Sequence, residues 1–413
     1  MSLWSPVWKI TINGVEYTNL TISNVKISSG RMDIERQPVA GYVNLEILNT
    51  TQSAVIIAIN DGVTIAVKDS SGSFINLFGG FVSDIEISIT SAGSTAISQR
   101  IKLTALGALS RLPKALTTGV LSKDYDGNQI YSILSDFLVN NWNEVPAAET
   151  WNDYNASTTW ANAENVGLGE IDTPGQYELA ARTSSTTDIY SLVSGLATSG
   201  LGYLYEDANG NIGYADAAHR QTYFLANGYV DISANDAIAS GLKIKESTGS
   251  IKNNVVVKYD AGEESSQDST SIGIYGQMGA EIQTSLHNSA DALSQSDRYL
   301  KLRAYPRFIF DSITYPIQSP EIDNSDRDNF LNIFMGMPIR ITDLPINMLG
   351  GEFTGFVEGW NWNAGINGLY LTIFASPSEF SWIAQKWNDV NGSEAWNTLS
   401  ATLEWENAIG VIS

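Results

Sequence analysis

The sequence predicts a mainly β protein with an α+β middle part, in which two β-barrel-like domains flank a helix-plus-hairpin domain. Two observations carry this prediction. Only 16% of the 413 residues are charged, and Ser, Thr, Asn and Gly occupy the polar positions instead, a composition that suits strands and polar turns. The hydrophobic period is two over most of residues 8–106 and 308–377, and it changes to 3.6 in the middle of the chain.

Residues 1–112 are predicted to form the first β-barrel domain. Apolar and polar side chains alternate from Trp8 onward, and Asn13-Gly14 is a typical hairpin turn. Short strands spaced about 8–12 residues apart indicate a barrel or a sandwich. Further strands of this domain are expected at 42–48, 62–69, 74–90 and 97–106.

Residues 113–245 are predicted to form a peripheral α+β domain. Apolar residues at helical spacing predict an amphipathic helix over 126–142. Residues 188–199 repeat this pattern, with Asp188 as the N-cap and Gly200 near the C-cap. The next segment reads as a hairpin whose turn is 207–210, so a helix followed by a hairpin forms the core of this unit.

Residues 246–377 are predicted to form the second β-barrel domain, and 378–413 a Trp-rich tail module. A helix capped by Ser289 is expected over 288–303, and the acidic, Ser-rich segment 260–271 is expected to be an exposed, flexible loop. The strands of this domain are expected at 251–259, 308–317, 337–343, 351–363 and 369–377.

Tryptophans recur every nine residues in two segments. Over 22 residues, ten identities align at a constant offset of 245. Neither a helix nor a strand places residues nine apart on one face, so we predict two looped or hairpin modules with similar backbones, at 142–163 and within the tail. Each module has three possible roles. Its tryptophans pack a peripheral segment against a barrel domain, form a docking site for a partner protein, or provide a surface on which sugar rings stack. The candidate site residues are Trp142, Trp151, Trp160, Trp387, Trp396 and Trp405.

Composition excludes several kinds of chemistry. The chain has no cysteine, which excludes disulfides, thiolate metal sites and cysteine nucleophiles. The formal net charge of −22 leaves no basic excess to release counterions from nucleic acid, so stable nucleic-acid binding is not expected. The N-terminal residues do not resemble a secretory signal, and no stretch approaches the ~20 apolar residues that cross a bilayer. A soluble protein is therefore expected, kept in a cytoplasm or in an assembly built there.

Motifs for catalysis, metals and cofactors do not emerge. The run that begins at Asp207 fails the EF-hand pattern because Ile212 and Ala218 occupy positions six and twelve, and the run from Asp124 fails likewise. No nucleophile elbow, zinc-protease motif or phosphate loop is present. Nothing singles out the paired carboxylates that a polysaccharide hydrolase would need. We therefore expect no enzyme activity and no cofactor.

Two further groups of polar residues have ordinary interpretations. The acidic cluster of Asp323, Asp326 and Asp328 is interpreted as a solvated loop, with a hard-cation site as the alternative. His219 and His287 are interpreted as surface or capping residues.

Several segments, taken in order, resemble the minor tail proteins of long-tailed bacteriophages, and more specifically the tail-tip or baseplate hub family. Residues 28–49, SSGRMDIERQPVAGYVNLEILN, resemble the opening hairpin of that family. LFGGFVSDIEI at 77–87 is similar to its following strand pair, and the helix plus hairpin at 189–220 matches closely. GFVEGWNWN at 355–363 and LYLTIFASP at 369–377 resemble its final strands. The resemblance covers about 370 residues and departs at the tryptophan modules.

The resemblance implies a ring-forming homotrimer at the distal end of the tail tube, in the virion, assembled in the bacterial host cytoplasm. Two barrel domains per chain then act as pseudo-repeats that match a hexameric tube. The partners it implies are tail tube and distal tail proteins, the tape-measure protein and tail fibre or receptor-binding proteins, with genomic DNA only in transit. The alternatives are a distal tail ring protein, which is usually shorter and hexameric, and a carbohydrate- or receptor-binding tail protein that uses its tryptophan modules.

Overall fold

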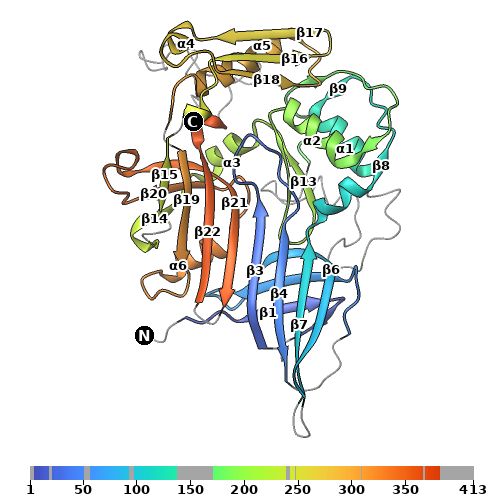
Figure 1. Ribbon diagram of the computed structural model, residues 1–413, viewed down its shortest axis with the longest axis vertical. Coiled ribbons are helices and arrows are strands. Elements are labelled where there is room, and N and C mark those ends of the chain that lie inside the picture. The colour runs from blue at the N-terminus through green and yellow to red at the C-terminus, as the bar shows by residue number, and fades with distance from the viewer. Residues whose placement is uncertain are drawn as a thin grey trace.

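The protein is mainly β with several helices, as the composition predicts (Figure 1). The computed structural model describes residues 4–17, 21–50, 56–92, 97–136, 171–238, 242–246, 248–307, 309–365 and 368–381. Both tryptophan modules lie outside these residues, so Trp142, Trp151, Trp160, Trp387, Trp396 and Trp405 stay predicted sites, and so does the similarity of their backbones.

The first β region contains the strands that the alternating pattern predicts. Asn13 and Gly14 have positive φ angles of 50° and 72°, which the tight turn between β1 and β2 requires. Neighbouring strands of this region are antiparallel, and their order in the sheet is β3-β4-β7-β6-β5-β1-β2. The strands are β1 (Trp8–Ile12), β2 (Val15–Glu16), β3 (Thr21–Gly30), β4 (Tyr42–Asn49), β5 (Gly62–Lys68), β6 (Phe74–Ala92) and β7 (Ile97–Leu106).

The second β region is built mainly from the end of the chain, with two short strands from the middle. The strand β14 pairs in parallel with β20, and β15 pairs antiparallel with β19. The helix α6 (Asn324–Leu331) precedes β20. The strands are β14 (Val230–Ser233), β15 (Lys243–Lys245), β19 (Ile309–Pro316), β20 (Pro338–Thr342), β21 (Phe353–Gly365) and β22 (Gly368–Pro377).

These two β regions form one sheet of 13 strands rather than two closed barrels, so the prediction of separate barrels is wrong. Strand β3 pairs with β4 on one edge and with β21 on the other, from Gly359↔Gly30 to Ala364↔Val25. The edge that would close the first barrel is therefore occupied by a strand of the second region. Figure 1 shows β21 and β22 beside β3 and β4.

The middle of the chain packs as a small α+β unit. The side chain of Asp188 accepts a hydrogen bond from the backbone N–H of Ser191, which confirms the predicted cap. The predicted hairpin is confirmed as β12 and β13. The elements are η1 (Ala108–Lys114), β8 (Leu116–Thr117), β9 (Asp124–Tyr125), α1 (Asp126–Ser135), β10 (Glu178–Leu179), β11 (Thr187–Asp188), α2 (Ile189–Ser199), β12 (Tyr203–Glu206), β13 (Ile212–Ala215) and α3 (His219–Asn227).

A three-stranded sheet lies at one end of the molecule, covered by the helix α5 (Ser289–Arg303) (Figure 1). Its order is β17-β16-β18, where β16 is Asn254–Tyr259, β17 is Gly262–Gln267 and β18 is Gly279–Gln283. The predicted loop 260–271 is thus wrong, because it contains β17 and the start of α4 (Ser269–Tyr275). The polar sequence GEESSQ concealed an edge strand in which only Ser266 is buried.

The α5 cap also differs by one residue from the prediction, because Asn288 rather than Ser289 is the N-cap. The remaining 3-10 helices are η4 (Ala234–Asp236), η6 (Thr248–Ser250), η7 (Leu349–Gly351) and η8 (Ser378–Phe380).

Two hydrophobic cores hold these parts together. One core runs through both β regions and includes the fully buried Trp362. The other combines the middle unit with the three-stranded sheet, through residues such as Val193, Val255 and Ala292. The predicted domain ranges 1–112, 113–245, 246–377 and 378–413 stay predictions.

Candidate functional site

One face of the large sheet is solvent-facing and continuous across both β regions. Side chains on this outer face come from positions that alternate with core residues along seven neighbouring strands, β19-β22-β21-β3-β4-β7-β6. One row of paired positions shows the pattern: Pro316, Tyr370, Asn363, Lys26, Asn44, Thr104 and Asp84. The face is thus a broad polar surface, with few large apolar groups.

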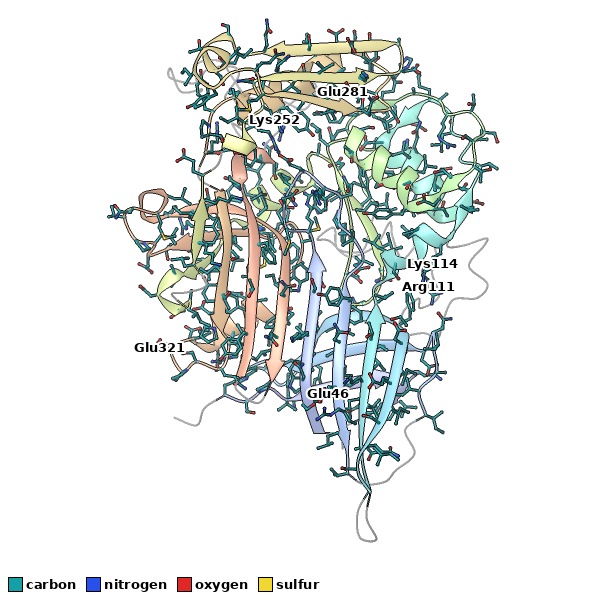
Figure 2. All side chains as sticks on the ribbon, viewed as in Figure 1. Glu46, Arg111, Lys114, Lys252, Glu281 and Glu321 are labelled. Carbon is teal, nitrogen blue, oxygen red and sulfur yellow. The ribbon has the colours of Figure 1, made fainter. Side chains whose placement is uncertain are left out.

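Charges on this outer face are balanced, although the chain as a whole is acidic. Lys102 lies 3.4 Å from Glu86, and Arg100 lies 3.3 Å from Glu46. Figure 2 shows Glu46 on these strands, whereas Glu281 and Glu321 lie on other parts of the molecule. Lys26 of β3 and Asp84 of β6 belong to the same face and add one further charge of each sign. The acidic excess is therefore carried elsewhere.

A buried ionic cluster lies where the two β regions meet α3. Glu358 stands at a bulge in β21 and is 1% exposed. Arg220 of α3 donates two hydrogen bonds to its carboxylate, at 2.6 and 3.0 Å, and Arg31, directly after β3, donates a third at 2.6 Å. The Arg220 guanidinium also lies 4.3 Å from the ring centre of Tyr203. The cluster thus ties three parts of the chain to one carboxylate.

The protonation of Glu358 follows from this geometry. Burial on its own raises the pKa of a carboxyl group, but the two guanidinium groups outweigh that effect and lower the pKa of Glu358 to about 2. The side chain is therefore an anion at any pH at which the protein is expected to work, and it offsets the charge of Arg31 and Arg220.

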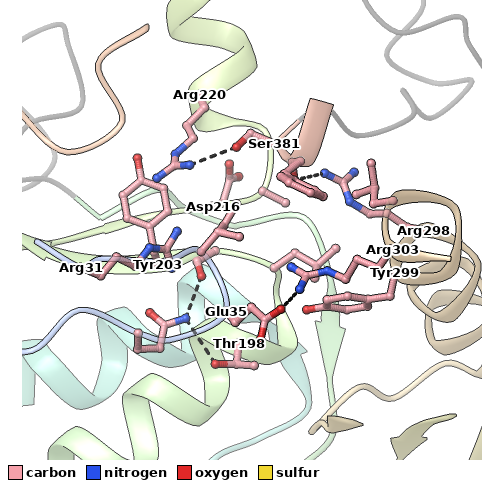
Figure 3. Close-up of a pocket in the computed structure, with 17 residues that line it drawn as sticks. Arg31, Glu35, Thr198, Tyr203, Asp216, Arg220, Arg298, Tyr299, Arg303 and Ser381 are labelled. Atoms are coloured by element: carbon pink, nitrogen blue, oxygen red, sulfur yellow. Dashed lines mark hydrogen bonds and ion pairs between the residues drawn. The ribbon is translucent and has the colours of Figure 1, made fainter. Parts of the chain in front are cut away.

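A cavity of about 90 Å³ opens beside this cluster (Figure 3). Besides Arg31 and Arg220, it is lined by Arg298 and Arg303 of α5. Figure 3 shows these side chains approaching from different elements, with Ser381 near Arg220 and Glu35 near Arg303. We call this space the arginine cavity. It gathers four guanidinium groups in a chain that has only 23 Lys and Arg residues.

A second buried carboxylate organises the middle unit. Asp126 at the start of α1 is 0% exposed. Its Oδ1 accepts hydrogen bonds from the backbone N–H groups of Gln176 and Tyr177, each at 2.8 Å, and its Oδ2 accepts one from the hydroxyl of Tyr214. Burial outweighs these bonds and raises the pKa of Asp126 to about 7.

We expect this carboxyl group to make stability fall as pH rises. Because its pKa is higher in the folded state than the ordinary 3.8, the native protein binds more protons between pH 4 and 7. The loss should be about 2 kcal/mol between pH 5 and pH 7. Asp126→Asn keeps an acceptor for the two amides and offers a donor to Tyr214, so we expect the variant to lose this contribution. Glu206, whose pKa burial also raises to about 7, keeps its own contribution in the variant. Urea unfolding at pH 5 and at pH 7 measures the free energy of unfolding of both proteins. If that free energy changed equally between the two pH values in the variant and in the wild type, Asp126 would not be the titrating group.

The other sequence-predicted groups have structural roles. Asp207 Oδ1 accepts from the backbone N–H groups of Asn209 and Asn211, as expected for a turn. His219 Nδ1 lies 2.7 Å from Asp172, whereas His287 lies 3.9 Å from Asp260. Among the described residues, no group of three or more His, Asp or Glu is placed to hold a metal ion.

The acidic cluster at 323–328 is the start of a helix, so its interpretation as a loop is wrong. Asp323 caps α6 by accepting from the backbone N–H of Asp326. Asp328 accepts a hydrogen bond of 3.0 Å from the backbone of Ser70 and a second from its hydroxyl. The cluster thus joins α6 to a turn of the first β region.

The residues of the ionic cluster do not stand out in the sequence. The sequence does contain one indication of a buried, paired charge. Glu358 is the single charged residue in the otherwise apolar or neutral run GFVEGWNWN. Its partners could not be read in the same way, because Arg31 lies 327 residues away and Arg220 lies on α3, a helix that the pattern did not predict.

Within the described part of the chain, no helix combines the length and the apolar character that crossing a membrane requires.

Comparison with known proteins finds the same fold in tail proteins. No family model and no curated protein matches the sequence. The 43 kDa tail protein of prophage MuSo2 from Shewanella oneidensis superposes with a TM-score of 0.55, over 91% of this chain and 98% of that chain, at 13% identity. The tail protein from Neisseria meningitidis MC58 gives a TM-score of 0.55 over 90% and 97% of the two chains, at 9% identity. The resemblance to phage tail proteins that the sequence motifs indicated is therefore confirmed at the level of the fold.

Proposed function

We propose that this chain is a structural component of a bacteriophage tail, namely the minor tail or hub protein that forms a ring at the distal end of the tail tube. The observation that carries the proposal is the likeness to a prophage tail protein over 91% of this chain and 98% of the other. A match of this extent leaves less than a tenth of this chain outside the superposition, so it favours the role of a whole tail protein over that of a shared module.

The joined sheet suits a ring subunit. Two β regions that share one sheet cannot reorient independently, and they present one wide surface with a fixed curvature. Three copies related by rotation would place six β regions around an axis through interfaces that close on themselves. The resemblance to the hub family implies this arrangement, in which the ring continues the sixfold order of a tail tube. Docking of tube, tape-measure and fibre proteins around the ring belongs to the same proposal.

The outer sheet face is suited to line the passage for DNA. Its polar side chains and balanced charges offer no cluster of cations that would hold phosphates by counterion release. The net charge of −22 repels DNA at longer range. In the proposed ring, DNA passes a wall to which it does not adhere, and the protein contributes shape rather than chemistry.

Native mass spectrometry of the full chain tests the proposal. We expect a species with the mass of three chains of 44.8 kDa each. Gold-labelled antibody against the chain should mark the end of the tail that is distal to the head in negatively stained virions. A hexamer would favour the distal tail ring protein instead, and label on the capsid or neck would contradict a tail-tip role.

A further inference from the structure

A group of carboxylates lies at one side of the second β region, around the start of α6 and the short helix η4. Burial raises the pKa of Asp236, and the negative charges of four neighbouring side chains raise it further. These neighbours are Asp326, Glu321, Asp323 and Asp343. Figure 2 shows Glu321 at the outer surface of this part of the molecule. Within the described part of the chain, none of the five carboxylates forms an ion pair with a Lys, Arg or His side chain.

Two of these carboxylates have no structural role that explains them. Asp323 caps α6, and Asp343 accepts a hydrogen bond of 2.8 Å from the hydroxyl of Ser233. The side chains of Asp236 and Asp326 are partly buried, and neither accepts a hydrogen bond from a described residue. We call Asp236 and Asp326 the carboxylate pair. Partial burial and mutual repulsion both disfavour its two negative charges.

One arginine lies close to this group, but it is engaged elsewhere. Arg327 of α6 donates hydrogen bonds to the carbonyl oxygens of Ile317 and Ile322, at 3.1 and 2.7 Å. The carboxylates that attract its guanidinium are those of Asp328 and Asp323. The carboxylate pair is therefore not neutralised by this cation.

A buried hydroxyl without a partner lies beside the carboxylate pair. Tyr315 of β19 is 0% exposed, and its hydroxyl forms no hydrogen bond with any described residue. Its ring packs against Phe330 of α6 with ring centres 4.5 Å apart, and Asp326 lies one helical turn before Phe330. Burial raises the pKa of Tyr315, and the charges of Asp236 and Asp326 raise it further, so both carboxylates lie near this side chain. Buried polar groups in native proteins are nearly always satisfied, so the hydroxyl is a second, independent indication of a missing ligand.

The chemistry of these groups selects the class of ligand. Among the described residues, no three His, Asp or Glu side chains are placed to hold a metal ion, and a hard metal ion takes about six or more oxygen ligands. A guanidinium group is planar and pairs best with one carboxylate, through two parallel hydrogen bonds. An ammonium group has three donors that point in different directions, so it can bind two carboxylates from separate elements at once. Its positive charge also relieves the repulsion between them.

We propose that Asp236 and Asp326 bind the ammonium group of a lysine side chain that a neighbouring protein presents, and that the Tyr315 hydroxyl donates to the carboxylate pair when the cation is bound. The pair belongs to two surface elements, η4 and α6, of a chain whose net charge of −22 favours basic partners. The proposal goes beyond the tail role and does not depend on the oligomeric state of the chain.

Thermal unfolding of the full chain with a short lysine peptide tests this site. The probe is the N-acetylated tripeptide amide Gly-Lys-Gly at about 100 mM, roughly ten times the dissociation constant expected for so small a ligand. The control is the same peptide acetylated on the lysine Nζ, in sodium chloride of equal ionic strength. We expect the lysine peptide to raise Tm by about 1–2 °C relative to this control. No rise, or an equal rise with the acetylated peptide, would overturn the proposal.

Three further ligands test the chemical class. At equal ionic strength, the corresponding arginine peptide, spermidine and calcium chloride should each raise Tm less than the lysine peptide does. A larger rise with the arginine peptide would contradict the preference for ammonium, and a larger rise with spermidine would assign the site to a free polyamine. A larger rise with calcium that a chelator reverses would assign it to a metal ion.

Two variants with the same change of charge locate the effect. Asp236→Asn should abolish the rise in Tm that the lysine peptide causes. Asp84→Asn should retain it, because Asp84 is exposed on β6 in the other β region. Equal rises in the two variants would place the peptide elsewhere. Saturation-transfer NMR on the wild type needs no variant: we expect stronger transfer to the lysine side chain than to its acetylated form, and equal transfer would count against the site.

Tyr315→Phe separates a ligand site from ordinary core packing. Because the hydroxyl has no described partner, its removal should leave the Tm of the free protein within about 1 °C of the wild type, or raise it. The rise caused by the lysine peptide should fall by about half, since one of three interacting groups is lost. A free variant that melts several degrees lower would show that the hydroxyl has a structural partner, and an undiminished peptide effect would exclude it from the site.

Discussion

Glu358→Gln should reduce the free energy of unfolding by about 3–5 kcal/mol, which is the usual cost of removing one partner from a buried ion pair. The introduced amide would still accept hydrogen bonds, but Arg31 and Arg220 would stay buried without a counterion. The effect should also depend on pH. Because the pKa of Glu358 falls from 4.5 to about 2 on folding, its stabilisation is complete above pH 4.5 and is lost as pH falls toward 2.

Chemical denaturation followed by circular dichroism and tryptophan fluorescence measures this change. Glu379→Gln is the matched control, because Glu379 forms an exposed ion pair of 3.0 Å with Arg307 and should contribute no more than about 1 kcal/mol. If the two variants lost equal stability, the cluster would be behaving as a solvated surface pair, and its role in joining the β regions to α3 would have to be abandoned.

Gly30→Ala should have an effect of similar size, about 3–5 kcal/mol, at the seam between the two β regions. Gly30 has a φ of +80°, and an added Cβ would lie 2.3 Å from the backbone oxygen of Glu358 and 2.6 Å from the Cα of Gly359. Backbone atoms cannot move aside as a flexible side chain can, so β3 and β21 would have to separate. Urea unfolding and the protection of β3 amides from hydrogen exchange are the measurements.

Gly350→Ala separates the two causes. Gly350 has a similar φ of +73°, but an added Cβ would meet nothing within 4 Å. Its cost should therefore be the conformational penalty alone, about 1–2 kcal/mol. If Gly30→Ala lost no more unfolding free energy than Gly350→Ala, the seam would tolerate a wider spacing between β3 and β21 than the structure shows.

Local patterns predicted most elements because local physics forms them. The strand at 97–106 follows from alternation, and the helix at 189–199 follows from its apolar spacing and the Asp188 cap. Strand β17 and helix α6 were missed because each buries very few apolar groups, so their sequences read as solvated loops. Propensity and period carry little information where an element is mostly exposed.

Pairing between distant elements could not be predicted. Two β regions were visible in the sequence, but the pattern of Ile27 or Trp362 says only that each side chain faces a core. It does not say which strand lies beside β3. The open sheet and the charge pairing of Arg31 with Glu358 both depend on that choice of neighbour, and so the candidate site was the part least accessible to sequence reasoning.

The pairing of β3 with β21 has a consequence for how the protein is made. A ribosome that adds 5–20 residues per second needs roughly 20–70 s to proceed from β3 to β21. During that time the edge of β3 that β21 will cover has no strand beside it, and open edges of this kind invite pairing between chains. Each nascent chain therefore passes through an interval of tens of seconds in which aggregation competes with completion, and slower translation lengthens that interval.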